Sequence, residues 1–190
     1  MSGGRPALPP RPEGRPSPRE LLGVLADQVG ESSAALLCAD VLDADDPAAQ
    51  AATVRFLGGR AGESVLAGTG GWKAYWARTW GARGLLYVWD DRVAPVVLSR
   101  LSDEAWRVAE MCMKVATLRE LPGADAAVRL STHELPLVRA VAMRLLGAAG
   151  DTEHVAAAMD GLGDPDPLVR RAASRAVRRL ETRLDVTLPT

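Results

Sequence analysis

A helical unit recurs along the second half of this 190-residue chain, with a period just above thirty residues. Three polar turns are each followed by an amphipathic helix with an arginine near its start, and these arginines, 32 and 31 residues apart, are Arg107, Arg139 and Arg170. A shorter apolar helix is expected before each of them, at residues 93–101, 124–130 and 154–162. Because such a hairpin exposes an apolar face when it stands alone, the period restricts the chain to a stacked array of helices.

The composition favours the same architecture. Alanine occupies 32 positions and aromatic residues only 8. Alanine, leucine and arginine are among the better helix formers, whereas strands favour aromatic and β-branched residues. In the last amphipathic helix, Ala172, Ala173 and Ala176 are small enough to let a neighbouring helix approach closely. We predict an all-α fold, a right-handed α-solenoid of about five helical hairpins.

The last repeat carries a family resemblance. Residues 164–177, which read Asp-Pro-Asp-Pro-Leu-Val-Arg-Arg-Ala-Ala-Ser-Arg-Ala-Val, resemble the second helix of HEAT repeats, including the phycobilin-lyase-like short HEAT group. Residues 93–103, which lead into Trp106, look like a first helix and turn of the same module. The resemblance is strong over residues 91–183 and weak over residues 31–89, where Gln50 stands in place of the arginine.

The resemblance also implies structural roles for the repeated arginines. In HEAT repeats a turn aspartate and the arginine after it form a ladder between neighbouring repeats. By this analogy the ladder residues of this chain are Asp103, Arg107, Arg139, Asp166 and Arg170. The middle repeat departs from the pattern, because Leu135 occupies the acidic position with Glu134 beside it. We expect Arg107 and Arg170 to be partly buried and bonded to turn carboxylates or carbonyls.

The sequence predicts three regions. Residues 1–16 hold five of the 13 prolines and little apolar material, which favours a disordered leader. Ser17 and Glu20 then form a capping box around Pro18, so the first helix begins there. Residues 17–184 are predicted to be one HEAT-like domain, and residues 185–190 a short C-terminal tail.

Charge restricts the classes of partner. A formal net charge of −1 excludes a globally basic nucleic-acid binder, so any such role needs a local patch. The local balance is uneven: residues 27–46 carry six acidic side chains and no basic one, whereas residues 165–183 carry six arginines against two acids. Four arginines of the last helix share one exposed stripe that suits an acidic partner, and these are Arg171, Arg175, Arg178 and Arg179.

Aromatic residues are concentrated between positions 72 and 106, which hold seven of the eight. Trp72, Trp76 and Trp80 are spaced four residues apart, so they share a face if one helix carries all three. Two interpretations remain open. The rings fill the space left by a shortened repeat, or they form a partner surface together with Arg78 and Arg83, since Trp, Tyr and Arg dominate interface hot spots.

No set of residues predicts a cofactor, a metal site or a catalytic centre. The segment Gly68-Thr-Gly-Gly-Trp-Lys73 lacks the spacing of a phosphate-binding loop. The chain has two histidines, His133 and His154. A metal site that needs three or four histidine ligands is therefore not expected. Trp106 and Glu110 lie one turn apart and are weakly similar to the site of HEAT-like DNA glycosylases for alkylated bases.

The predicted function is a non-catalytic HEAT-like interaction module that binds another protein. A nucleic-acid-acting protein, either a DNA binder or an alkylated-base glycosylase, is the alternative. With two cysteines and no apolar run of about 20 residues, the chain is expected to lie in a bacterial cytoplasm rather than in a membrane. Its oligomeric state is left open.

Overall fold

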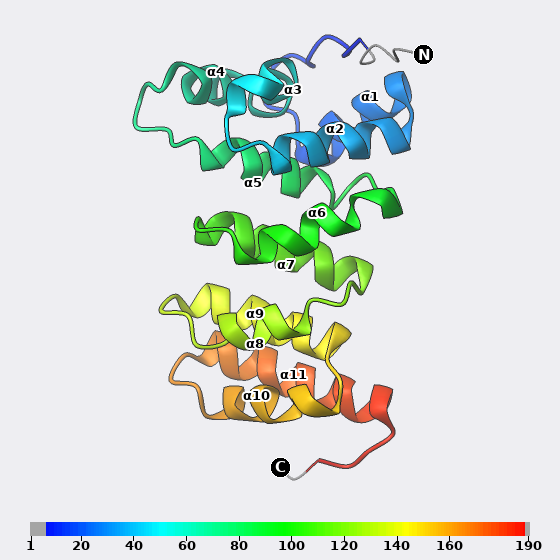
Figure 1. Ribbon diagram of the computed structural model, residues 1–190, viewed down its shortest axis with the longest axis vertical. Helices are drawn as coiled ribbons and strands as arrows, with labels where there is room; N and C mark the ends of the chain where they lie inside the picture. The colour runs from blue at the N-terminus through cyan, green and yellow to red at the C-terminus, as the bar shows by residue number, and fades with distance from the viewer. Residues whose placement is uncertain (1–6, 189–190) are drawn as a thin grey trace. The chain divides into compact units, whose positions relative to one another are not determined.

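The computed structural model describes residues 7–188, and this part of the chain contains eleven α-helices and no strand (Figure 1). The prediction of an all-α fold is therefore confirmed. The contacts divide the chain into two compact units, unit 1 up to Arg100 and unit 2 from Leu101 onward. Helical repeats contact mainly their neighbours along the chain, so each unit buries a core of its own. One HEAT-like domain over residues 17–184 stays a prediction.

Unit 1 has a core built around two helices, α2 and α5. Its helices are α1 (Pro18–Val29), α2 (Glu31–Asp43), α3 (Ala51–Gly58), α4 (Arg60–Ala67), α5 (Tyr75–Gly84) and α6 (Ala94–Ser99). The predicted capping box is confirmed, because Ser17 Oγ accepts the Glu20 N–H and Glu20 accepts the Ser17 N–H. Cys38 lies in the core, and burial raises the pKa of its thiol to about 12, which keeps the thiol protonated.

Two glycines of α5 allow this helix to pack closely on α2. A Cβ atom at Gly81 would lie 2.6 Å from the Cys38 carbonyl oxygen and 2.8 Å from the Leu42 nitrogen. A Cβ atom at Gly84 would lie 2.5 Å from the Cys38 sulfur. Because the atoms facing Gly81 belong to the backbone, they cannot move aside as a flexible side chain would. The two helices therefore need a residue without a side chain at this position.

We expect Gly81→Ala to lower the free energy of unfolding by about 2–3 kcal/mol, as overpacking does in a close-packed core. Gly23→Ala is the matched control, because Gly23 lies inside α1 and a Cβ there would contact nothing within 4 Å. That change should raise stability by about 0.5–1 kcal/mol, since alanine restricts the unfolded chain. Urea unfolding measures both, and equal stability of the two variants would contradict the close-packing argument.

The described part of the leader, residues 7–16, contacts the helices of unit 1. Residues 1–6 lie outside the described residues. Over residues 7–16 the chain has no helix, yet Arg11 Nη1 donates a hydrogen bond of 3.0 Å to the Phe56 carbonyl oxygen at the end of α3. Its guanidinium also lies against Gly59, where a Cβ would be 2.8 Å from Arg11 Nε. Proline restricts the free segment, which lowers the entropy cost of this docking and offsets its lack of apolar residues.

We expect removal of residues 1–16 to lower the melting temperature, which a fully disordered leader would leave unchanged. Arg11→Ser should reproduce most of the loss, about 1 kcal/mol, because it removes the bond to Phe56. Arg15→Ser is the control, since this exposed arginine makes no such bond among the described residues. Thermal unfolding by circular dichroism gives the values, and an unchanged midpoint for the truncated chain would restore the prediction of disorder.

Unit 2 contains two layers of helices. Its α-helices are α7 (Trp106–Arg119), α8 (Ala124–Leu130), α9 (Pro136–Ala149), α10 (Val155–Asp160) and α11 (Pro167–Leu184). The long helix α9 packs against both α7 and α11, while the short helices α8 and α10 pack on α9 and α11 respectively. The short helices form the first layer, and we call α7, α9 and α11 the second-layer helices. The predicted helix at residues 124–130 is confirmed, and the one at residues 154–162 is α10 flanked by 3-10 turns.

Within the described residues, no single helix is long and apolar enough to cross a membrane. The pair α1 and α2 meets the length and composition test only when the two are taken together, and they are bent by 119° relative to each other. Their large apolar side chains, such as Leu25 and Leu42, are buried inside unit 1.

Candidate interaction surfaces

The turns of unit 2 repeat one local hydrogen bond. The residue three positions before each second-layer helix accepts the N–H of the residue two positions later. This acceptor is Asp103 Oδ1 before α7 (2.9 Å), His133 Nδ1 before α9 (3.0 Å) and Asp164 Oδ1 before α11 (2.8 Å). The polar turn residues thus fix the start of each helix, and the histidine takes the place of an aspartate in the middle turn.

One arginine links two successive turns of unit 2. Arg139 Nε and Nη2 donate to the two carboxylate oxygens of Asp164 at 2.7 and 2.9 Å, and both side chains are only 13% and 11% exposed. The Arg139 guanidinium holds the pKa of Asp164 below its ordinary value. The predicted acidic partner was Asp166, but that residue instead accepts the Leu168 N–H and caps α11. The ladder partner is therefore the first aspartate of the turn, not the second.

Arg139 and Arg170 bind their own turns in the same way. Arg139 Nη1 donates to the carbonyls of His133 and Glu134, and Arg170 Nη1 donates to those of Asp164 and Pro165. Arg170 is exposed, although the sequence predicted partial burial. Arg107 lies two residues earlier in its helix than the other two arginines, and its guanidinium carbon lies 4.2 Å from the centre of the Trp106 ring. It therefore has different surroundings.

We expect Arg139→Ala to lower the free energy of unfolding by about 2–3 kcal/mol, because it leaves the largely buried Asp164 carboxylate and two turn carbonyls without their donor. Arg170→Ala should cost only about 1 kcal/mol, since its carbonyl partners can bond to water instead. Chemical unfolding of both variants gives the comparison. Equal losses would show that the Arg139–Asp164 pair adds nothing.

The same pair predicts a dependence on pH. Because its folded-state pKa is lowered, Asp164 contributes stability above its ordinary pKa and loses it as the pH falls through the folded-state value. The difference in stability between the wild type and Asp164→Asn should therefore narrow in acid. A difference that stays constant over the acid range would contradict a charged pair.

The predicted arginine stripe lies on the exposed side of α11. All four of its residues are exposed, but two have contacts inside unit 2. Arg178 Nη1 donates to Ser174 Oγ at 2.8 Å, and Arg179 Nη2 lies 2.5 Å from Glu120 Oε1, just beyond the end of α7. Arg179 is thus partly neutralised, which leaves Arg171, Arg175 and Arg178 as the more available charges.

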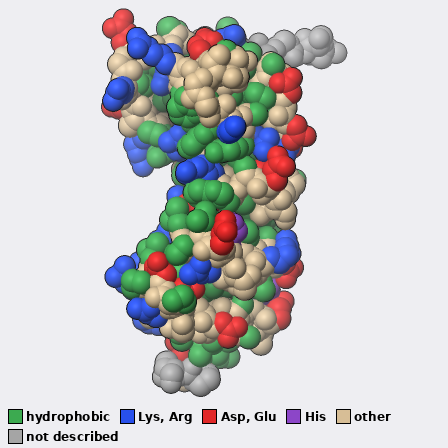
Figure 2. All heavy atoms as spheres, turned by 90° about the vertical axis from the view of Figure 1, so that its left-hand side faces the viewer, with side chains coloured by type: hydrophobic (Ala, Val, Ile, Leu, Met, Phe, Trp, Pro, Cys, Tyr) green, Lys and Arg blue, Asp and Glu red, His purple; other side chains and the backbone are tan. Residues whose placement is uncertain are grey.

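The stripe continues onto the two preceding second-layer helices. Lys114, Arg144 and Arg175 each lie eight residues after the first residue of their helix, in α7, α9 and α11. Arg144 is exposed and was not predicted, although its position in the repeat is a signal that the sequence contains. On the face drawn in Figure 2, lysine and arginine side chains lie at both edges of the lower part, with acidic side chains beside them. Lys114 is only half-exposed and is paired with Glu110, so we call the following set the basic face: Arg144, Arg171, Arg175 and Arg178.

The tryptophan cluster in unit 1 is partly core and partly surface. Trp72 lies before α5, yet its ring centre is 5.4 Å from that of Trp76 and 5.9 Å from that of Trp80. Trp80 and Arg78 are each 6% exposed, whereas Trp72 is 36% exposed. Trp80 and Arg78 were predicted to bind a partner, and their burial removes them from the surface because α5 turns them toward the core. Trp72 and the half-buried Trp76 remain accessible.

The residues with possible catalytic or metal-binding roles are held in structural contacts. Glu110 is 5% exposed, and its Oε1 lies 2.5 Å from Lys114 Nζ. His154 is buried, accepts the Asp151 N–H at Nδ1 and has its Nε2 3.2 Å from Asp125 Oδ1. Within residues 7–188 no group of three or more His, Cys, Asp or Glu side chains is placed to hold a metal ion.

Comparison with known families agrees with this geometry. The model for HEAT repeats matches residues 124–189, the segment that contains α8 to α11. This match supports HEAT repeats in residues 124–189. The match does not reach the phycobilin-lyase-like subgroup, which stays a prediction. No curated protein and no solved structure matches the chain. HEAT repeats commonly serve as scaffolds for protein interaction.

Proposed function

We propose that this chain is a non-catalytic HEAT-like interaction module whose basic face binds an acidic surface of a partner protein. The observation that carries the proposal is that Arg144 and Arg175 occupy the same position of two successive second-layer helices, and both are exposed. Because α9 packs against α11, these charges lie on neighbouring helices of unit 2.

The basic face offers little to folding, which supports a role in binding. Exposed like charges on one stripe repel each other. Among the described residues, no carboxylate forms an ion pair with Arg144, Arg171 or Arg175. Their summed positive potential favours an acidic surface and speeds its encounter.

A protein fits this face better than a nucleic acid does. Leu118 and Leu137 are 54% and 43% exposed on the same two helices as Lys114 and Arg144. Apolar side chains beside charged ones are typical of protein interfaces, whereas nucleic-acid affinity depends mainly on contacts to phosphates. Trp72 and Trp76 of unit 1 form a second accessible surface for the same kind of partner.

The wider architecture belongs to the same proposal. Repeated helical hairpins in both units support a right-handed α-solenoid of about five hairpins. Cys38 and Cys112 are both free and buried, which agrees with a cytoplasmic location. The fold therefore does not depend on a disulfide bond between these two cysteines.

We expect the triple change Arg171→Ser, Arg175→Ser and Arg178→Ser to preserve folding and to weaken partner binding at least tenfold. Its partner is first identified by affinity capture with the wild-type chain, and dissociation constants are then measured with the purified partner by calorimetry. Binding by the wild type should also weaken as salt rises, because the charges are exposed and screened.

The matched control removes three other exposed arginines, Arg15, Arg55 and Arg129, and so has the same net charge as the first triple variant. Arg55 forms a surface ion pair with Glu63, which adds little to stability. If both triple variants bind equally, or if affinity ignores salt, the basic face is not the site. Tighter binding to DNA than to any captured protein would favour the nucleic-acid alternative.

A further inference from the structure

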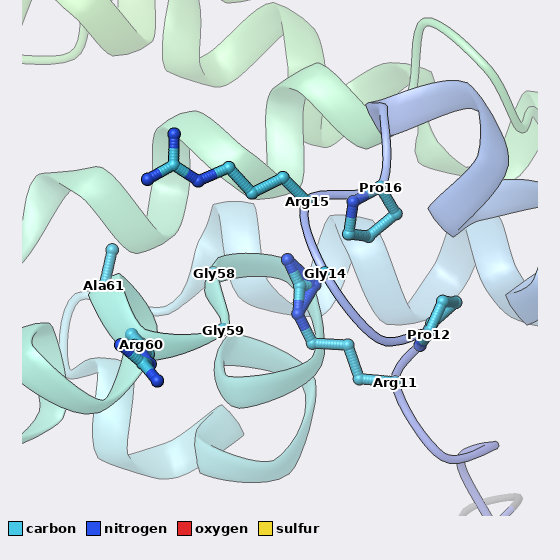
Figure 3. Close-up of a pocket in the computed structure, with 9 residues that line it drawn as sticks. All are labelled: Arg11, Pro12, Gly14, Arg15, Pro16, Gly58, Gly59, Arg60 and Ala61. Atoms are coloured by element: carbon cyan, nitrogen blue, oxygen red, sulfur yellow. The ribbon is translucent and has the colours of Figure 1, made fainter.

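The leader and the turn between α3 and α4 border an open cavity in unit 1 (Figure 3). Its volume is about 730 Å³, and one wall is the extended segment that contains Arg11 and Arg15. The opposite wall is formed by Gly58, Gly59 and the first residues of α4, including Arg60. In Figure 3 the side chain of Arg11 points toward Gly59, and that of Arg15 extends toward the start of α4.

The charge of this cavity is one-sided. Arg11, Arg15 and Arg60 line it, and no acidic residue does. Arg55, the next arginine along α3, is paired with Glu63 at 3.0 Å, but no described carboxylate pairs with Arg15 or Arg60. Three guanidinium groups without a counter-charge create a positive potential that favours a bound anion. The guanidinium fork suits carboxylate and phosphate oxygens, and a phosphate can accept several such bonds at once.

A second cavity of about 260 Å³ adjoins the first and has a different lining. The two share four lining residues, so they lie side by side, and these residues are Arg11, Pro16, Gly58 and Ala61. The walls of the second cavity include Trp72 and Trp80 together with leucine side chains, and its cation besides Arg11 is Arg83. Trp72 is the exposed member of the pair and offers an aromatic surface to a ligand.

We propose that the two cavities form a binding site for a nucleoside phosphate, with the phosphate among Arg11, Arg15 and Arg60 and the base beside Trp72. The arginine cavity would bind the anionic part of such a ligand. The adjoining aromatic cavity would bind the planar apolar group attached to it. Bases stack on tryptophan without regard to sequence, because every base has a flat ring. The site lies wholly in unit 1 and is independent of the basic face.

The leader is part of this site rather than a tether. Arg11 is held by its bond to the Phe56 carbonyl, and this bond places Arg15 and Pro16 over the turn at Gly58 and Gly59. Gly59 has a φ of 56°, which favours glycine, and its missing side chain leaves room for the Arg11 guanidinium. The same docking that stabilises unit 1 therefore completes the cavity.

The test titrates the full chain with adenosine 5′-monophosphate, adenosine and inorganic phosphate, followed by tryptophan fluorescence and calorimetry. We expect the nucleotide to bind at least tenfold more tightly than either of its parts and to change the fluorescence. The double variant Arg15→Ser, Arg60→Ser should weaken nucleotide binding at least tenfold, and Trp72→Leu should abolish most of the fluorescence change. Circular dichroism checks that each variant is folded.

A charge-matched control separates the site from a general effect of charge. The variant Arg19→Ser, Arg55→Ser loses two arginines of unit 1 that do not line either cavity, and it should bind as the wild type does. The proposal is overturned if the nucleotide does not bind, if adenosine binds as tightly as the nucleotide, or if the control loses as much affinity as the cavity variant.

Discussion

Close contact between second-layer helices determines what unit 2 can display. A Cβ at Gly147 of α9 would lie 2.7 Å from the Ala176 Cα of α11, so these backbones almost touch. With α7 on its other side and α8 beneath, α9 exposes little more than Leu137 and Arg144. Small residues on the packed rows thus confine the charged side chains to one narrow outer strip, and the basic face is a product of that packing.

The two units use the same rule in different forms. In unit 1 the close approach occurs between α2 and α5 at Gly81, and it leaves the bulky Trp80 buried beside it. The irregular turn at Gly58 and Gly59 then opens a cavity that the leader covers. In unit 2 the accessible feature is the charge of exposed arginines on α9 and α11. The two units therefore differ in what they expose: a cavity beside the leader in unit 1 and a group of charged side chains in unit 2.

The sequence predicted the elements that depend on local chemistry. The capping box at Ser17 and the helix at residues 124–130 follow from cap residues and apolar periodicity. It missed α4, because glycine lowers the helix propensity there and tertiary packing favours that helix. It considered one helix for Trp72, Trp76 and Trp80, but α5 begins at Tyr75 and carries only the last two. It also assigned Asp166 to the ladder, since two aspartates in one turn cannot be told apart without knowing which faces Arg139. Burial of Arg78 depends on contacts between distant segments, which no local pattern reports.

The arginine ladder has a direction. Arg139 uses one edge of its guanidinium for its own turn and the other for Asp164 of the following turn. Arg170 bonds to the carbonyls of its own turn in the same way. No described carboxylate bonds to the Nε edge of its guanidinium. The end of unit 2 is thus a template for elongation: an added repeat whose turn aspartate follows Arg170 at the same spacing would find its anchoring group already oriented.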